Sequence, residues 1–332
     1  MSGITVLDSF CQTAPIPQCA LIGPKSPIQG SSGILATCYA RNIDVGNTII
    51  FQAASDFAHI AALAMTVIMI LHVRSKFTAV GRKEITDFFY LYMLLTAISL
   101  VVDAGVVPPG SGPFPWFVAG QNGLASATCT CLLINGFVGF QLYEDGTNLS
   151  VWLLRASSAG MFVISYIISL FTFKGWVGFD PANPVGLFVV VYVLNAICLA
   201  IYVIMQLFLV WNTLDDRWPL GHISLGVFFF VVGQVLVYAL SAKICDSIQH
   251  YLDGLFFGTI CNLFAVMMIY KYWDSITKED LEFSVGVKSN NWDIKEVNEE
   301  DRRLTIYPDG GSEYAPSTHY RSSTFGANHS GY

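Results

Sequence analysis

Long apolar stretches separated by short polar connections dominate the hydrophobic pattern of this chain. Each stretch is long enough to cross a hydrocarbon core about 30 Å thick as one helix. The seven expected spans are residues 48–73, 85–105, 115–142, 150–173, 185–211, 220–242 and 250–273. After Trp273 the chain turns hydrophilic and does not become apolar again. The pattern predicts an all-α integral membrane protein with seven transmembrane helices, a Cys-, Pro- and Gly-containing N-terminal segment (1–47), a seven-helix domain (48–273) and a tail (274–332).

Composition agrees with this class of protein. Hydrophobic residues make up 54% of the 332 residues and charged residues only 12%, which is too little charge to coat a water-soluble globule. From Asp274 onward there are 11 acidic and 6 basic side chains, a net charge of −5 out of −7 for the whole chain. The tail is therefore expected to be acidic and disordered. Basic patches with interleaved aromatic residues are missing from the sequence, so nucleic acid is not an expected partner.

Positive charge decides the expected orientation in the membrane. The loop after the first span, RSKFTAVGRKE, holds four basic residues, and such loops favour the cytoplasm. With the N-terminus outside, eight basic residues lie at cytoplasmic span ends and four on the outer side: Arg74, Lys76, Arg82, Lys83, Arg155, Arg217, Lys271 and Lys278 against Lys25, Arg41, Lys174 and Lys243. We therefore expect an N-terminus in the lumen or outside and a cytoplasmic C-terminus.

The eight cysteines fit the same orientation. Four of them lie within spans, and the other four, Cys11, Cys19, Cys38 and Cys245, all fall on the expected outer side. In an oxidising lumen these four can form two disulfides in any of three pairings. A bond from Cys245 to one of the other three would clamp the N-terminal segment over the loop between the sixth and seventh spans.

Ionisable residues inside spans are costly and are functional hypotheses by default. Asp56 and His59 lie three residues apart in the first span, Asp103 near the outer end of the second, and Asp253 near the outer end of the seventh. We expect these four to form an intramembrane polar network. Asp103 and Asp253 are predicted to pair with basic residues at the outer surface, and Asp56 and His59 to make hydrogen bonds between helices. The same is expected of Asn122, Asn135, Asn195, Gln206, Gln234 and Asn262.

Catalytic, metal and cofactor interpretations fail on missing residues. A retinal protein needs a lysine midway along its last span, whereas Lys271 lies at the end of the seventh. A seven-span zinc hydrolase needs several converging histidines, and neither HxxxH nor HExxH occurs. Gly110-Ser111-Gly112 is too short for a phosphate cradle and is read as a turn between prolines. No enzyme activity, metal or cofactor is expected.

Five sequence segments resemble the fungal chitin synthase export chaperones. They are CYARNIDVGNTIIF (38–51), VVDAGVVPPGSGPFPWFVA (101–119), GFQLYEDGT (139–147), FFFVVGQVLVYALSAKIC (228–245) and HYLDGLFFGTICNLFAVMMIYKYWD (250–274). The resemblance follows most of 38–286 in order and is weak in the first 37 residues and the distal tail. It implies a multi-pass protein of the endoplasmic reticulum membrane that helps a polytopic chitin synthase to fold and leave for the cell surface. Onward travel with this client to the plasma membrane is a further expectation. The family has no established catalytic residues, so none are carried over.

This resemblance gives several residues an expected role. The loop residues Pro108, Pro109 and Trp116 and the small-residue face made by Gly254 and Gly258 in GLFFG are candidate client contacts within the lipid bilayer. Asp280 and Glu282 form a DxE triplet just past the last span, which fits the di-acidic export signal read by the vesicle coat. The expected partners are thus a chitin synthase, the vesicle coat machinery and membrane lipid.

Two other classes of function stay open, of which the first has the same topology. A heptahelical receptor or sensor would bind a ligand in a polar pocket and signal through its cytoplasmic loops. A small-molecule transporter would use Asp56 and His59 as a coupling site. Ligand-dependent signalling would identify the first class, and loss of flux in Asp56→Asn the second.

Overall fold

The computed structural model describes residues 2–23, 33–46, 48–77, 79–138, 146–213 and 217–286. The chain divides into two units, 1–279 and 280–332. In the second unit the described residues, 280–286, are the last residues of helix α10 (Gly254–Gly286). The architecture below is that of the first unit.

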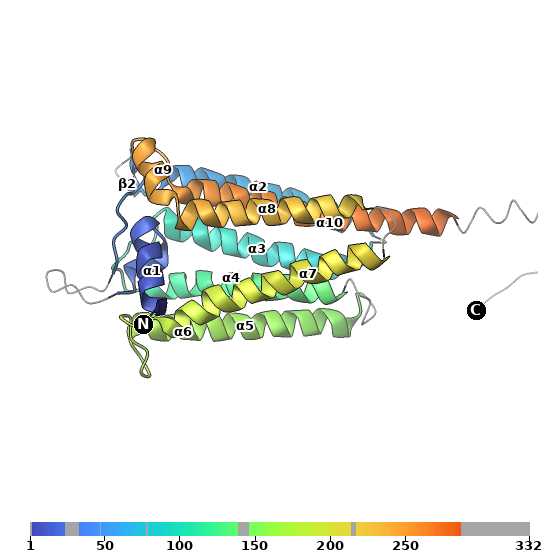
Figure 1. The fold of residues 1–332 in the computed structure, drawn as a ribbon, viewed down its shortest axis with the longest axis horizontal. Coiled ribbons are helices and arrows are strands. Elements are labelled where there is room, and N and C mark those ends of the chain that lie inside the picture. The colour runs from blue at the N-terminus through green and yellow to red at the C-terminus, as the bar shows by residue number, and fades with distance from the viewer. Residues whose placement is uncertain are drawn as a thin grey trace, which may run out of the picture. The chain divides into compact units, whose positions relative to one another are not determined.

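Seven helices in the described part of the chain are long and apolar enough to cross a membrane, which confirms the predicted number of spans (Figure 1). Five of these spans are each one continuous α-helix: α2 (Ala53–Ser75), α3 (Arg82–Asp103), α4 (Phe114–Val138), α5 (Asn148–Lys174) and α8 (Trp218–Tyr238). One is built from α6 (Val185–Phe188), the π-helical turn η2 (Val189–Leu194) and α7 (Asn195–Thr213). The seventh is the Gly254–Thr277 part of α10.

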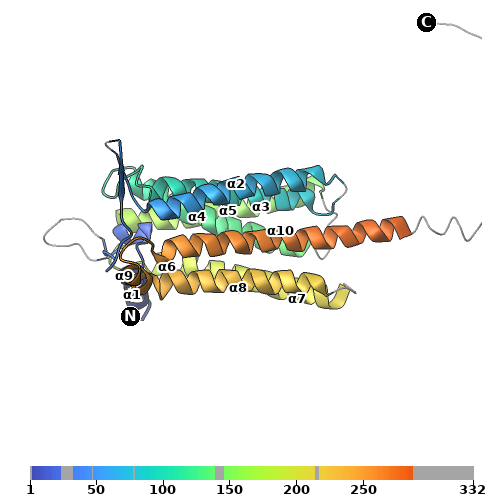
Figure 2. The same ribbon diagram turned by 90° about the horizontal axis from the view of Figure 1, so that it is seen from above.

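Shorter elements gather at one end of the helices, here called the α1 end (Figures 1 and 2). They are α1 (Ser2–Thr13), the 3₁₀ turn η1 (Pro17–Ala20), strands β1 (Ile43–Val45) and β2 (Thr48–Ile50), and α9 (Ser241–Ser247). The strands pair antiparallel, with Val45 opposite Thr48. Gly46 has a φ of +55°, which suits the tight turn of such a hairpin.

Some predicted span boundaries at the α1 end are wrong. The first span starts at Ala53 instead of residue 48, because Thr48–Ile50 is β-branched throughout and pairs as a strand. The sixth span ends at Tyr238, and α9 replaces the expected loop after it. The seventh begins at Gly254 instead of residue 250, because Gln249 and His250 have positive φ angles and cannot be helical. The predicted end of the third span, at residue 142, lies outside the described residues.

The last helix continues past the predicted membrane boundary. Its backbone is helical to Gly286, whereas the predicted span ends at Trp273, so residues 274–286 extend the helix. The expected tail therefore starts with a helical segment that includes residues 280 and 282. Residues 287–332 lie outside the described part of the chain.

Burial differs strongly among the spans. In α4, 61% of the most apolar window is buried, whereas in α8 only 11% is. A central cluster joins α2, α3, α4, α5, α7 and α10 around Phe88, Phe89 and Cys131. A second cluster at the α1 end packs Leu7 and Ile22 of the N-terminal segment against Val118 of α4 and Leu187 of α6. The N-terminal segment is thus part of the folded core of this end.

Candidate functional site

Two disulfides fasten the α1 end. Cys11 bonds to Cys19 within the N-terminal segment, and Cys38 bonds to Cys245 of α9, which is 207 residues away in sequence. This is one of the three pairings that the sequence left open. All four residues are buried, Cys38 with 3% and Cys245 with 0% of its surface exposed. The second bond ties the N-terminal segment to the turn between α8 and α10.

His250 lies against the second disulfide. Its Nδ1 atom is 3.0 Å from Cys38 Sγ and 3.6 Å from Cys245 Sγ. The His250 N–H donates to the Cys245 carbonyl at 2.9 Å, and the His250 carbonyl accepts from the Arg41 N–H at 2.7 Å. Ligand atoms of these three residues lie within 4.8 Å of one another, as in a metal site. The two sulfurs are bonded to each other, however, so neither offers the thiolate that a metal requires.

The four ionisable residues of the predicted polar network come together near the same end. His59 Nε2 and Asp103 Oδ2 are 3.0 Å apart and both side chains are buried. Asp56 is within electrostatic range of both, and Asp253 within range of Asp103. The prediction that Asp103 pairs with a surface cation is wrong: His59 of α2 is its partner. The expected hydrogen bond to Asp56 is not formed either, since neither of its carboxylate oxygens has a partner among the described residues.

Asp253 begins the last helix. Its Oδ1 accepts a hydrogen bond of 3.2 Å from the Phe256 N–H, which caps α10, whereas its Oδ2 has no partner among the described residues. Only 1% of its surface is exposed. Burial, and secondarily the charge of Asp103, raise the pKa of Asp253 above its ordinary value. A negative charge at Asp253 is therefore unfavourable in the folded protein.

A column of polar side chains crosses the middle of the bundle. Asn195 Nδ2 donates to Ser126 Oγ at 3.1 Å, and Ser126 Oγ to Ser165 Oγ at 3.0 Å. Asn122 Nδ2 reaches Ser169 Oγ at 3.3 Å and Gln18 Oε1 at 3.4 Å, which connects α4 to α5 and η1. These bonds hold helices together in a medium without water, as predicted for the two asparagines.

The other amide side chains for which hydrogen bonds between helices were predicted differ in their hydrogen bonding. Gln206 donates to the Gly136 carbonyl at 3.4 Å and accepts from Tyr272 at 2.6 Å, so it links α7, α4 and α10. Asn135 donates to the Glu84 carbonyl at 3.4 Å. Asn262 Oδ1 has no partner among the described residues. Within the described part of the chain, Gln234 makes no side-chain hydrogen bond that would support the expected role.

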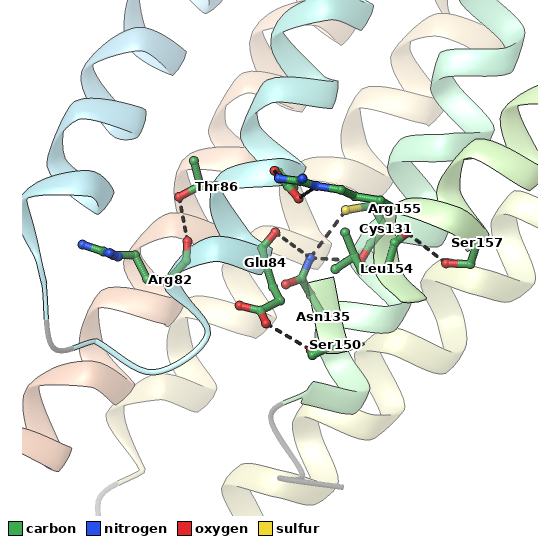
Figure 3. Close-up of polar contacts among 10 residues, drawn as sticks. Arg82, Glu84, Thr86, Cys131, Asn135, Ser150, Leu154, Arg155 and Ser157 are labelled. Carbon is green, nitrogen blue, oxygen red and sulfur yellow. Dashed lines mark hydrogen bonds and ion pairs between the residues drawn. The ribbon is translucent and has the colours of Figure 1, made fainter. Parts of the chain in front are cut away.

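The opposite end of the bundle holds a residue that the sequence analysis missed. Glu84 is completely buried, with 0% exposure, in the first turn of α3. Its Oε1 accepts from the Gly146 N–H, just before α5, at 2.9 Å. The same oxygen accepts from Ser150 Oγ, in the first turn of α5, at 3.0 Å (Figure 3). A carboxylate there is favoured by the positive end of the α5 dipole. By sequence, the RKE triplet belongs to the basic loop after the first span, so Glu84 is not among the candidate residues.

Further contacts reinforce this junction of α3 and α5. Arg155 of α5 makes two hydrogen bonds to the Asp87 carboxylate of α3, at 2.6 and 3.0 Å. Lys83 Nζ donates to the Gly146 carbonyl at 2.8 Å. Lys76, just after α2, pairs with Asp274 of α10. Several of the basic residues expected at the cytoplasmic surface therefore also hold helix ends together.

The client-contact candidates differ in accessibility. Pro108, Pro109 and Trp116 are exposed on and beside the loop between α3 and α4. Gly254 and Gly258, in contrast, face α8: a Cβ at Gly258 would lie 2.3 Å from Val237 Cγ2, and one at Gly254 would lie 2.5 Å from the Leu236 carbonyl oxygen. This small-residue face serves the protein's own bundle and is closed to a partner, which corrects that candidate. Residues 280 and 282 lie on the α10 backbone, in the second unit.

Comparisons with known proteins agree with one another. The model of the chitin synthase export chaperone family matches residues 3–287. A protein named chitin synthase export chaperone from Aspergillus fumigatus is 68% identical over 326 residues, which cover 98% of each chain. One of the same name from Coccidioides immitis is 69% identical over 321 residues, 96% of this chain and 97% of the relative. One from Fusarium oxysporum f. sp. lycopersici is 65% identical over 321 residues, 96% of each chain.

No solved structure matches the chain. The family match covers all seven spans in full and the N-terminal segment from residue 3, and the relatives align over almost their whole length. The chain therefore belongs to the chitin synthase export chaperone family.

Proposed function

We propose that this protein is a membrane chaperone that assists the folding of a polytopic chitin synthase and its export from the endoplasmic reticulum, and so supports chitin synthesis in the cell wall. The single observation that carries the proposal is family membership over residues 3–287, with relatives of the same name at 65–69% identity. The family is named for a chaperone and not for a catalyst, which agrees with a role that needs no substrate turnover.

Lateral contact within the membrane is the proposed mechanism. A client with many spans exposes polar and small-residue helix faces until it assembles, and a second membrane protein can cover them with complementary faces. Apolar side chains such as Phe228 and Val231 of α8, 58% and 51% exposed, are available to lipid or to such a client. The buried polar column is already satisfied within the bundle, so it is not available for this purpose.

The proposed orientation places the α1 end in the lumen and the end of α10 in the cytoplasm. The excess of basic residues at the opposite end supports it, because Arg74, Lys76, Arg82 and Lys83 all lie between α2 and the first turn of α3. The two disulfides support it as well, since an oxidising compartment is where such bonds persist. The proposed location is the endoplasmic reticulum membrane, with onward movement to the plasma membrane together with the client.

The exposed loop that includes Pro108 and Pro109, with the neighbouring Trp116, is the proposed client contact at the luminal membrane surface. Trp116 is 42% exposed, and a large aromatic ring of this kind supplies much binding area at low entropic cost. Replacing Trp116 by Ala should reduce recovery of the synthase with the chaperone without lowering the chaperone's own melting temperature. Trp218, exposed at 76% near the opposite end, provides the matched control as Trp218→Ala. Equal recovery in both variants would remove this surface from the proposal.

The decisive experiment combines copurification and deletion. A chitin synthase should copurify with the tagged protein in mild detergent, and cells lacking the protein should retain that synthase in the endoplasmic reticulum and deposit less chitin. Normal delivery of the synthase in the deletion strain would refute the proposed function. Conversion of a small molecule by the purified chaperone alone would also contradict it.

A further inference from the structure

The disulfide between Cys38 and Cys245 has an imidazole directly beside it. His250 Nδ1 is 3.0 Å from Cys38 Sγ and 3.6 Å from Cys245 Sγ, so one ring nitrogen contacts both sulfurs. Cys11–Cys19, at the same end of the bundle, is a natural comparison because its cysteines are just as buried. Among the described residues, the two disulfides thus have similar burial, and one of them has a histidine in contact.

The backbone around His250 is held in an unfavourable conformation. Gln249 and His250 have φ angles of +53° and +66°, which non-glycine residues seldom adopt. Two short hydrogen bonds, from the His250 N–H to the Cys245 carbonyl and from the Arg41 N–H to the His250 carbonyl, maintain this turn. Two consecutive residues with positive φ angles indicate that the surrounding structure fixes the backbone that carries the His250 ring. His250 is an exposed residue, whereas Cys38 and Cys245 are buried.

We propose that Cys38, Cys245 and His250 form a thiol–disulfide exchange site whose substrates are dithiols. A thiolate of the dithiol bonds to Cys245 Sγ, and the sulfur–sulfur bond breaks. Its electron pair goes to Cys38 Sγ, which takes a proton from Nδ1 of the His250 imidazolium. The second thiol of the dithiol then attacks its own first sulfur and forms an internal disulfide. This step releases Cys245 as a thiolate that takes up the remaining proton.

The reaction balances without another reagent. The dithiol loses two electrons and two protons and becomes a disulfide, and Cys38 and Cys245 become two thiols. His250 acts as a catalytic residue because exchange is faster when the leaving sulfur is protonated as it departs. The consequence for the fold is release of the one covalent link between the N-terminal segment and α9. A disulfide with a purely structural role does not require a proton donor within 3.0 Å of its sulfur.

The test measures reduction of each disulfide separately in the full-length protein. The purified protein in lipid nanodiscs is exposed to dithiothreitol, quenched with an alkylating reagent at intervals, and analysed by mass spectrometry of the cysteine peptides. In the unaltered protein Cys38–Cys245 should be reduced about tenfold or more faster than Cys11–Cys19. In His250→Asn that advantage should disappear, while the rate at Cys11–Cys19 stays unchanged. Asparagine tolerates a positive φ, so this variant keeps the turn.

Gln249→Asn is the matched control, because it changes the neighbouring residue with the same backbone conformation and keeps the imidazole. It should retain the fast reduction of Cys38–Cys245. Equal rates at Cys38–Cys245 in the unaltered protein and His250→Asn would overturn the proposal. An equal loss in Gln249→Asn would also overturn it, because the effect would then come from the turn. A similar change in the reduction rate of Cys11–Cys19 in His250→Asn would also overturn the proposal, because it would show that the whole α1 end has loosened.

Discussion

Glu84 shows how one buried carboxylate can join two transmembrane helices. It is completely buried in α3, and its two hydrogen-bond donors are the Gly146 N–H just before α5 and Ser150 Oγ in the first turn of α5. Hydrogen bonds to a charged acceptor are stronger than neutral ones, and removal of the acceptor leaves the donors buried without a partner. The residue therefore secures the start of α5 against α3.

Replacing Glu84 by Ala should lower the free energy of unfolding by about 3 kcal/mol, because two donors lose their acceptor and a small cavity forms. Glu84→Gln, which keeps one acceptor oxygen and the side-chain volume, should cost about 1 kcal/mol. Chemical denaturation in detergent, followed by helical circular dichroism, gives both values. Similar losses for the two variants would show that volume and not hydrogen bonding is what matters at this site.

Asp253 gives a pH-dependent prediction. Its pKa is raised by burial and by the charge of Asp103, so ionisation destabilises the fold. This penalty is absent below the ordinary pKa of an aspartate. It grows as the pH rises from that ordinary pKa to the raised pKa of the folded protein, and it is constant above the raised pKa. Asp253→Asn keeps a good helix cap without the charge. The variant should therefore melt at a higher temperature than the unaltered protein at neutral pH, with the difference vanishing at acidic pH.

Thermal melting of both proteins across a pH series tests this directly. A difference that is independent of pH would mean that the charge at Asp253 is not the cause. Ser241, whose hydroxyl accepts from the Gly254 N–H at 3.0 Å, provides a control as Ser241→Ala. That substitution should lower the melting temperature by a similar amount at every pH, because a serine hydroxyl does not titrate in this range.

At the residue scale, sequence could predict which polar groups gather and not how they pair. Asp56, His59, Asp103 and Asp253 are spaced along three spans such that they share one end, and they do come together. Their partners depend on helix rotation, which a nearly all-apolar span does not encode. His59 was therefore not identified as the partner of Asp103. Glu84 was overlooked because its neighbours Arg82 and Lys83 make the triplet look like a solvated loop.

At the scale of elements, α8 and α10 depend on close approach. Gly258 faces Val237, and Gly233 of α8 faces Cys261 of α10, where an added Cβ would lie 2.9 Å from Cys261 Cβ. Figures 1 and 2 both show the two helices side by side. α8 is the least buried span, and it packs against α7 as well as α10.

Gly258→Ala should therefore lower the free energy of unfolding by about 1–3 kcal/mol, since the new methyl group overlaps Val237. Gly160→Ala in α5 is the matched control, because a Cβ there meets nothing within 4 Å. The control should be neutral or slightly stabilising, as alanine favours helix over glycine by up to about 1 kcal/mol. Denaturation of both variants under the same conditions gives the comparison, and equal destabilisation would contradict the close packing of α8 and α10.

The elements themselves were largely predictable. Hydrophobic length alone located all seven spans, because the membrane imposes a minimum run of apolar residues. The errors lie at the α1 end, where TII forms a strand, KICDS forms α9, and the Gln249–His250 turn delays the last helix. Those local structures depend on tertiary partners, including the disulfide from Cys38 to Cys245, that no hydropathy profile contains.

At the scale of the whole molecule, the proposed role requires that the chaperone leave the endoplasmic reticulum together with its client. The proposed signal is the pair Asp280 and Glu282, which follows the last span on the expected cytoplasmic side. Two carboxylates at this position offer charge to basic side chains of a coat protein, and a membrane-anchored cargo needs only modest affinity because many copies concentrate on one surface.

Replacing both Asp280 and Glu282 by Ala should hold the chaperone and the synthase in the endoplasmic reticulum while leaving their association intact. Fluorescence microscopy of the two tagged proteins measures location, and copurification measures association. Glu279→Ala is the matched control, because it removes a neighbouring acid that is outside the triplet. Retention in the double variant with export in the control would separate a specific signal from loss of local charge. Export of both variants would instead mean that the synthase, and not its chaperone, carries the signal that the coat reads.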